Sequence, residues 1–262
     1  MVLSNPEETA VRLEKKVAVV TGAGSGMGLA MARRFVEEGA SVVAVDWHAD
    51  TLAQAVKEIG RGTIVAHTAN VALEDEAIGM VGRAVNEFGR IDILVNNAGV
   101  MDTFQSVADV DNDTWRRVMS INVDGPMFAM RKAVPLMLAQ QSGTIVNVAS
   151  VAGVGGGSAG AAYTASKHAL IGLTRSTAFQ YAKTGLRCNA IASGGVETNI
   201  MASIDSTKID QAALGRLGAY HSVNPGMLQP IDLANLALFL ASDEARHING
   251  AIVPADMGWR AA

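Results

Sequence analysis

The sequence contains a single cysteine, few prolines and no long apolar run. Cys188 is the only cysteine among 262 residues, which excludes an intrachain disulfide and favours a reducing compartment. No apolar run reaches the roughly 18 residues that a membrane-spanning helix needs. The N-terminus carries Glu7 and Glu8 and lacks the apolar core of a signal peptide. We therefore expect a cytoplasmic protein without a membrane partner.

An excess of charge of one sign is also missing. The net charge is −4 and no run of like charges stands out. This disfavours a surface for nucleic acid or an anionic membrane, so the expected partner is a small molecule. The chain offers no clustered set of metal ligands, and we expect no metal.

Glycine, at 27 residues, and apolar side chains, at 49% of the sequence, are plentiful. This composition suits a well-buried α/β core with many tight turns. Short β-branched runs alternate with helical patterns, which predicts a doubly wound parallel sheet of about seven strands with helices on both faces. We expect strands at 16–21, 41–45, 63–66, 91–95, 144–149, 186–192 and 250–254, and helices at 29–38, 74–88, 114–139 and 231–242.

No repeat, linker or composition break divides the chain. We therefore expect one domain over residues 14–262, preceded by a polar N-terminal leader, 1–13. The segment 199–229 lacks clean periodicity and mixes glycine and proline with short apolar clusters. In an α/β enzyme such a segment is typical of a substrate lid.

A glycine-rich loop follows the first expected strand and leads into a helix. It reads Gly22-Ala23-Gly24-Ser25-Gly26-Met27-Gly28. Between a strand and a helix, such glycines allow a tight turn and the close approach of a diphosphate, whose charge meets the amides of the helix N-terminus. A glycine cluster without these flanks would indicate only a turn. Here it predicts a dinucleotide site.

Asp46 ends the next strand, at about the spacing expected for a ribose-binding carboxylate. A carboxylate accepts hydrogen bonds from both hydroxyls of the adenosine ribose and repels a 2′-phosphate. The following Trp47 and His48 bring no arginine or lysine. The sequence therefore favours NAD(H) over NADP(H). A helix N-cap role for Asp46 is compatible with this one.

Ser150, Tyr163 and Lys167 are expected to converge on one small volume. Tyr163 and Lys167 are four residues apart and share a helix face, while Ser150 follows the strand 144–149. A free tyrosine, with a pKa of about 10, is a poor base. A nearby lysine is expected to lower that pKa, so that Tyr163 exchanges protons while Ser150 hydrogen-bonds the reacting oxygen. A lone Tyr-x-x-x-Lys would more often be structural; the other motifs favour function.

Asn122 lies inside the long helical pattern 114–139. Its amide can open the backbone ladder and hold a water, a π-bulge-like feature that is common near active sites. Taken alone, a mid-helix asparagine is more often structural.

Taken together, the motifs resemble those of the classical short-chain dehydrogenase/reductase family, from about Leu13 to Gly258. The matching motifs are Thr21-Gly22-x-x-x-Gly26-x-Gly28, Asn96-Asn97-Ala98-Gly99, Asn122, Ser150 and Tyr163-x-x-x-Lys167. The resemblance implies a Rossmann fold, a nicotinamide cofactor and a homotetramer. It also implies a catalytic tetrad of Asn122, Ser150, Tyr163 and Lys167, in which Lys167 binds the nicotinamide ribose and Asn122 keeps a water in a proton relay.

The resemblance and the motifs together give the expected binding residues. Cofactor contacts are expected from Gly22, Ser25, Gly26, Met27, Gly28, Asp46, Trp47, Asn70, Val71, Asn97, Ala98, Gly99, Tyr163, Lys167, Gly194, Val196 and Thr198. Substrate contacts are expected from Ser150, Ala152, Val154, Gly160, Tyr163, Gly195 and Met201, with Val100 and Met101 beside them. These mostly small or apolar types indicate a neutral, mostly apolar alcohol or carbonyl compound. Steroid, cyclic ketone, sugar and short-chain alcohol all stay open.

Three positions depart from the family's pattern. Ser193 stands where proline is usual, which adds backbone freedom and an N–H beside the nicotinamide. Asn70 replaces a common aspartate near the adenine but still accepts a hydrogen bond through its carbonyl. The C-terminal Asp256-Met257-Gly258 lacks a second glycine that is common there. None of these changes touches the tetrad.

The leading hypothesis is an NAD(H)-dependent oxidoreductase that interconverts a secondary alcohol and a ketone. A 3-oxoacyl-[acyl-carrier-protein] reductase is the alternative among enzymes, but it usually goes with NADPH, against which Asp46 speaks. A non-catalytic NAD(H)-sensing regulator is the alternative of another class. Such a protein is expected to lack the tyrosine or the lysine, and both are present here.

Overall fold

The computed structural model describes residues 11–60 and 63–261. Most of the predicted leader therefore lies outside the described residues. Its last residue, Leu13, is fully buried, and its amide donates to the carbonyl of Glu38. Leu13 therefore packs with the domain.

A seven-stranded parallel sheet forms the centre of the molecule, in the order β3-β2-β1-β4-β5-β6-β7. This confirms the predicted doubly wound sheet, with the reversal of strand order falling between β1 and β4. The strands are β1 (Val17–Thr21), β2 (Ser41–Asp46), β3 (Ile64–Thr68), β4 (Ile93–Asn96), β5 (Gly143–Val148), β6 (Leu186–Ser193) and β7 (Ile252–Ala255).

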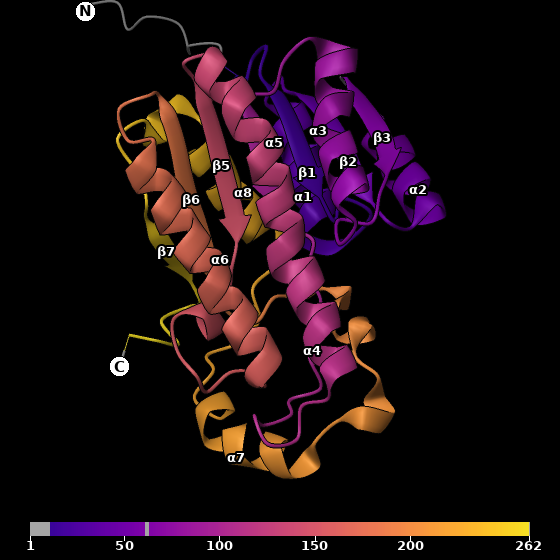
Figure 1. Cartoon of the computed structure of the whole chain (residues 1–262), viewed down its shortest axis with the longest axis vertical. Helices are drawn as coiled ribbons and strands as arrows, with labels where there is room; N and C mark the ends of the chain where they lie inside the picture. Colours follow the sequence, from indigo (N-terminus) through magenta and orange to yellow (C-terminus); the bar gives the residue numbers. More distant parts are fainter. Residues whose placement is uncertain (1–10, 61–62, 262) are drawn as a thin grey trace, which may run out of the picture.

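Helices cover both faces of the sheet (Figure 1). One face carries α1 (Gly26–Glu37), α2 (Ala49–Ile59) and α8 (Pro230–Ala241); the other carries α3 (Glu74–Phe88), α5 (Gly125–Ala139) and α6 (Ala161–Gln180). Alternation along a strand divides the two cores. In β1, Ala18 and Val20 pack toward α1 and α8, whereas Val17 and Val19 pack toward α3 and α5.

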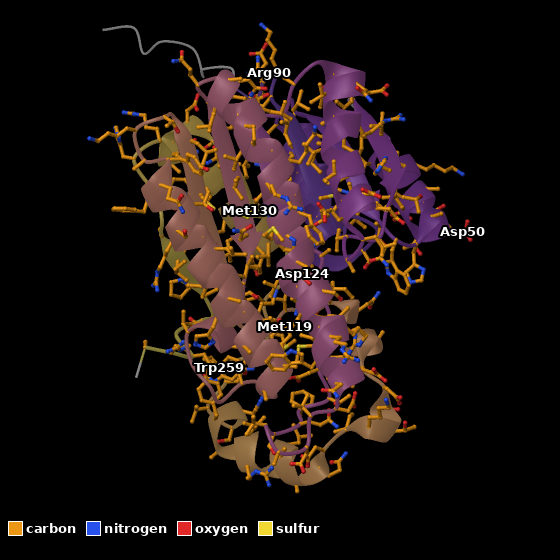
Figure 2. All side chains as sticks on the ribbon, viewed as in Figure 1. Asp50, Arg90, Met119, Asp124, Met130 and Trp259 are labelled. Carbon is orange, nitrogen blue, oxygen red and sulfur yellow. The ribbon has the colours of Figure 1, made fainter. Side chains whose placement is uncertain are left out.

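The predicted helix 114–139 is one continuous but irregular helical stretch. It consists of α4 (Asn112–Met119), a π-helical turn at Ser120–Asp124 and α5, so the π-bulge predicted at Asn122 is confirmed. Pro126 lies in the first turn of α5, where its missing N–H costs little. Figure 2 shows Met119, Asp124 and Met130 succeeding one another along this stretch.

Two helices fall outside the expected elements. In α2, Leu52, Ala55 and Ile59 are buried at helical spacing, a short pattern between the second and third strands that we did not assign. The other is α7 (Gln211–His221), inside the segment 199–229. Only Ala213 of α7 is buried, so this helix has little apolar periodicity to read.

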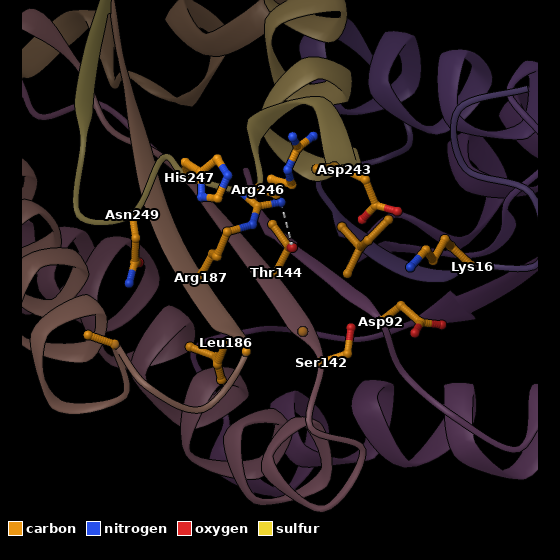
Figure 3. A pocket seen from close by; sticks show the side chains of 15 residues that line it. Lys16, Asp92, Ser142, Thr144, Leu186, Arg187, Asp243, Arg246, His247 and Asn249 are labelled. Carbon is orange, nitrogen blue, oxygen red and sulfur yellow. Dashed lines mark hydrogen bonds between the residues drawn. The ribbon is translucent and has the colours of Figure 1, made fainter.

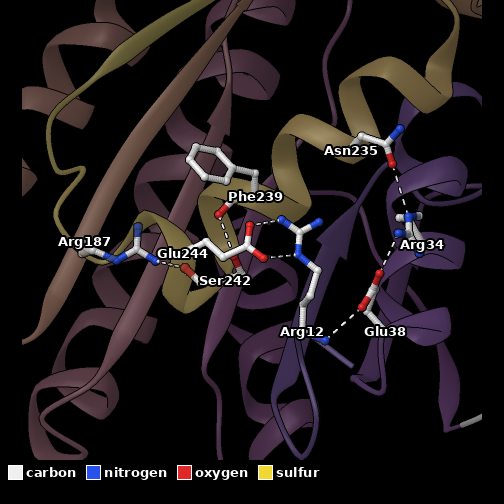
Figure 4. Close-up of polar contacts among 8 residues, drawn as sticks. All are labelled: Arg12, Arg34, Glu38, Arg187, Asn235, Phe239, Ser242 and Glu244. Carbon is white, nitrogen blue, oxygen red and sulfur yellow. Dashed lines mark hydrogen bonds and ion pairs between the residues drawn. The ribbon is translucent and has the colours of Figure 1, made fainter. Parts of the chain in front are cut away.

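The strands run with their carboxyl ends toward α4 and α7, as the β5 arrow shows (Figure 1). At the opposite end, Arg187 donates to the carbonyls of Leu240 and Ser242 and to the hydroxyl of Thr144 (Figures 3 and 4). Thr144 and Arg187 line a cavity of about 440 Å³ at the amino ends of the strands. Within the described ranges, no helix has the length and apolar character to cross a membrane.

Candidate active site

The carboxyl ends of β1, β2 and β4 open onto a cavity of about 970 Å³. In a doubly wound sheet, ligands bind at this edge where the strand order reverses. Twelve predicted cofactor residues line the cavity: Gly22, Ser25, Gly26, Met27, Asp46, Trp47, Asn70, Val71, Asn97, Ala98, Gly99 and Thr198. The structure thus brings together predicted cofactor residues from five separate segments of the chain. Gly28, Gly194, Val196, Tyr163 and Lys167 do not line the cavity.

The glycine-rich loop is held tightly against the segment after β4. A Cβ on Gly28 would lie 2.0 Å from the carbonyl oxygen of Gly22, so only glycine fits there. The hydroxyl of Thr21 accepts from the amides of Asn97 and Ala98, at 3.0 Å each. The Asn97 side chain donates to the Thr21 carbonyl at 2.9 Å. Asn97 therefore braces the segment after β4 against the end of β1.

In the contact between the glycine-rich loop and the segment after β4, one polar atom is available to a ligand. Asn97 Oδ1 is buried without a hydrogen-bond partner in the described structure. A buried acceptor without a partner costs roughly 1–3 kcal/mol, and a donor on a bound cofactor would remove that cost. Gly22, with φ of +69°, and Gly26, with φ of +53°, keep the cradle beside it free of side chains. These residues fit a nicotinamide dinucleotide.

Asp46 is fixed at the tip of β2 before any ligand binds. Its Oδ2 accepts from the Gly24 amide and its Oδ1 from the His48 amide, at 3.0 Å each. The carboxylate therefore faces the cavity from a defined position. Trp47, beside it, is 68% exposed and also lines the cavity.

Asn122 is buried in the π-helical turn and joins three elements. Its Oδ1 accepts from the Val100 amide at 2.9 Å, and its Nδ2 donates to the Val100 carbonyl and to the hydroxyl of Ser166. A Cβ on Gly99 would lie 3.3 Å from Asn122 Oδ1 and 3.5 Å from Lys167 Nζ. Asn122 and Lys167 thus flank the same glycine, as the predicted tetrad requires.

Tyr163 and Lys167 are both buried on α6, with the Lys167 ammonium 5.4 Å from the centroid of the Tyr163 ring. Lys167 Nζ donates to the carbonyl of Val148 at 2.9 Å. Burial lowers the pKa of Lys167 to about 8. Ser150 caps the short helical turn after β5, and its hydroxyl accepts from the Ala152 amide.

The pKa of Tyr163 moves in the direction opposite to the one expected. Burial raises it to about 12, a hydrogen bond with Ser150 acts against this, and the charge of Asp102 adds to the rise. Loss of hydration penalises the phenolate more than its neighbours stabilise it. The expected lowering of the Tyr163 pKa is therefore wrong.

The segment 199–229 covers Tyr163. Ile200, Ile204 and Leu214 pack against an apolar cluster that contains Tyr163, Ala152, Met101 and Phe104. The Ser203 hydroxyl accepts from the Met101 amide at 3.1 Å. This cover explains why the large cavity does not reach the tyrosine.

The predicted substrate residues are only partly brought together. Ala152 shares the cluster of Tyr163, and Gly160 begins the helix that carries it. Val154 instead packs in a different cluster, with Leu170 and Ile171. Met201 is 54% exposed. Gly195 lies against Met227, farther along the covering segment.

The structure shows the contacts or the backbone conformation at each of the three positions that depart from the family's pattern. Ser193 is paired in the sheet with Ala255, and the Gly194 amide donates to the Ala255 carbonyl at 2.8 Å, so β7 fixes the backbone that lacks proline. Asn70 Oδ1 accepts from the Ala72 amide. Met257 has a positive φ of 55°, where glycine would be less strained.

The sequence reasoning missed several site residues, among them Arg117 and Asp102. Arg117 lines the cavity and donates to the Met101 carbonyl at 2.8 Å; its only sequence signal is that it lies one helical turn before Ile121, another lining residue. Asp102 is buried beside α6 and accepts from the Tyr163 amide at 2.8 Å. A single acid three residues after Gly99 carries no recognisable pattern.

Comparisons with known proteins agree with this geometry. A family model described as short chain dehydrogenase matches residues 16–209. The chain is 42% identical over 256 residues to 3β-hydroxysteroid dehydrogenase 2 of Eggerthella lenta, covering 95% of this chain and 96% of the relative. It is similar to the crystal structure of levodione reductase, with a TM-score of 0.87, 32% identity and coverage of 96% of this chain and 100% of that one.

A second solved structure bears on the cofactor. It is a putative NAD(P) dependent gluconate 5-dehydrogenase from Beutenbergia cavernae with NADP bound at low occupancy. The TM-score is 0.84 and the identity 35%, over 97% of this chain and 100% of that chain.

Proposed function

Because this chain belongs to the short-chain dehydrogenase family, whose members are oxidoreductases that use a nicotinamide cofactor, we propose that it interconverts a secondary alcohol and a ketone with NAD(H). The observation that carries the proposal is the convergence of Asn122, Lys167 and Gly99, with Tyr163 and Ser150 beside them, next to a cavity of about 970 Å³.

Each residue of the tetrad has a task in this reaction. The bound nicotinamide supplies or accepts the hydride at the substrate carbon. Tyr163 gives a proton to the substrate oxygen in reduction and takes it back in oxidation, while the Ser150 hydroxyl orients that oxygen. Lys167 would hold the ribose of the nicotinamide cofactor, and Asn122 would keep the π-helical turn open for a water of the proton relay.

The choice of NAD(H) rests on Asp46. Its carboxylate is held at the cavity by the Gly24 and His48 amides, where it meets ribose hydroxyls favourably and a 2′-phosphate unfavourably. The putative gluconate 5-dehydrogenase, to which this chain is similar, was solved with NADP bound. A preference for NADP(H) is therefore the alternative outcome that the experiment must distinguish.

Replacing Asp46 by asparagine tests this assignment. Asparagine keeps one oxygen for the backbone but loses the charge, and hydrogen bonds to charged groups contribute about 1.5–3 kcal/mol. We expect the ratio of kcat/KM for NADH to that for NADPH to fall at least about tenfold. Asp50→Asn, an exposed acid at the start of α2, is the matched control. An unchanged ratio in Asp46→Asn would rule out the ribose role.

The proposed substrate is a mostly apolar molecule that carries its hydroxyl or keto group on a ring. The cluster around Tyr163 offers Met101, Phe104 and Ile200 to such a molecule. The names of the relatives support this class: a 3β-hydroxysteroid dehydrogenase and a levodione reductase. The segment 199–229 acts as the lid that must move to admit it, and a cytoplasmic homotetramer is the proposed form of the protein.

A panel of ketones tests the proposed function. Steroid ketones, small cyclic diketones, open-chain ketones and a 3-oxoacyl thioester are each offered with NADH and with NADPH. We expect NADH-dependent reduction of ring ketones. Thioester reduction with NADPH alone would favour the 3-oxoacyl reductase, and NADH binding without any turnover would favour the sensor.

A further inference from the structure

Asp102 is a buried carboxylate for which the proposed reaction, as described so far, has no task. It lies in the segment after β4, is 1% exposed and makes no ion pair within the described chain. Burying an ionised carboxylate without a cation is costly unless hydrogen bonds compensate. A function for this acid must therefore be sought in the groups that bind it.

The Asp102 carboxylate receives three backbone amides. Its Oδ1 accepts from Phe104 at 3.1 Å and from Gly160 at 3.2 Å, and its Oδ2 accepts from Tyr163 at 2.8 Å. Gly160 and Tyr163 belong to the start of α6, whose first amides have no partner within the helix. The carboxylate thus caps the helix through the amide of the proposed catalytic residue itself.

The surrounding backbone is shaped to admit this carboxylate. A Cβ on Gly160 would lie 2.5 Å from Asp102 Oδ2, so glycine is required at the N-cap of α6. Phe104 takes a left-handed φ of 61° while its amide reaches Asp102, a conformation that is costly for a bulky residue. The Ala161 amide adds a second tie, to the carbonyl of Gln105 at 2.9 Å.

We propose that Asp102 is a positioning residue, which fixes the first turn of α6, and with it Tyr163, to the segment that follows β4. This inference rests on the proposed function. That segment also carries Gly99 and Val100, which contact Lys167 and Asn122. The Asp102 carboxylate therefore fixes the position of Tyr163 relative to Asn122 and Lys167.

The charge of Asp102 has a consequence of its own, because it contributes to the raised pKa of Tyr163. The charged groups facing Tyr163 are Lys167 on its own helix and Asp102 from the segment after β4. Ser150 from the end of β5 and Asn122 from the π-helical turn are neutral, and the lid presents apolar side chains. Removing the negative charge should lower the pKa of Tyr163.

Asp102→Asn tests the inference, with Asp111→Asn as control, because Asp111 caps α4 by the same kind of bond without contacting α6. In Asp102→Asn we expect kcat to fall at least about tenfold. The limb of the pH profile that reports Tyr163 should move to lower pH. Asp102→Glu should lower kcat without moving that limb. The control should change neither.

A second measurement needs no substrate. Hydrogen exchange of the peptide covering residues 158–166 should accelerate in Asp102→Asn and stay unchanged in Asp111→Asn. Unchanged exchange, or an unmoved pH limb in an active Asp102→Asn protein, would overturn the inference. Failure of both Asp102 variants to fold would also overturn it, by assigning the carboxylate to stability. A wild-type protein that reduces no ketone would instead count against the proposed function, with the exchange result still deciding the positioning role.

Discussion

Replacing Tyr163 by phenylalanine is expected to abolish turnover and to leave NADH binding nearly unchanged. The substitution removes only the hydroxyl, and the ring stays in its cluster with Met101 and Ala152. Proton transfer by a positioned side chain contributes about 10²–10⁴-fold to the rate. We therefore expect kcat to fall by at least about a hundredfold, measured with the best ketone and saturating NADH.

The control for Tyr163→Phe is the same substitution at the other end of α6. Tyr181 follows the last residue of that helix and packs at the edge of the core on the sheet face that carries α3 and α5. Tyr181→Phe should retain full activity and NADH affinity. If Tyr163→Phe keeps more than about one hundredth of the wild-type rate, Tyr163 is not the proton donor.

Gly28→Ala is expected to have the largest effect on the cofactor site. The new Cβ would lie 2.0 Å from the Gly22 carbonyl oxygen and 2.6 Å from Asn97 Nδ2. Both neighbours belong to the contact between the glycine-rich loop and the segment after β4, so the overlap cannot be relieved by a flexible side chain. Forcing a methyl group into such a contact costs about 1–3 kcal/mol of stability. NADH binding, followed by fluorescence, should be lost.

Gly82→Ala is the matched control for Gly28→Ala. Gly82 is in α3, where an added Cβ meets nothing within 4 Å. Alanine is favoured over glycine in a helix interior by about 0.5–1 kcal/mol. The melting temperature of Gly82→Ala should rise and NADH binding should persist. Normal NADH affinity in Gly28→Ala would contradict the proposed cradle.

The fold was predictable because the central strands of the sheet are short and buried on both faces. In β1 every residue is buried, so the sequence shows a continuous apolar run instead of an alternation. The glycine loop and Asp46 follow two of these runs, and parallel strands bring such ends to one edge. The π-helical turn at Asn122 was predictable only together with the other motifs, because a mid-helix asparagine alone is more often structural.

The features that the sequence could not indicate depend on contacts between segments that are far apart in the chain. The direction in which the pKa of Tyr163 shifts is set by its burial, to which the segment 199–229 contributes, and that segment has no periodic sequence pattern. The link from Asp102 to the Tyr163 amide joins segments that only the packing of α6 brings together. The placement of Val154 away from Tyr163 follows from the path of the glycine-rich link, which leaves many routes open to the chain.

The central proposal is hydride transfer from NADH to a ketone carbon, and a competition between labelled cofactors tests it most directly. Equal amounts of NADH with deuterium in place of both C4 hydrogens of the nicotinamide and of unlabelled NADPH are supplied with an excess of a ring ketone, and the alcohol is examined by mass spectrometry. We expect most product molecules to carry one deuterium at the carbinol carbon. Unlabelled alcohol would assign the hydride to NADPH, and the absence of any alcohol would contradict ring-ketone reduction itself.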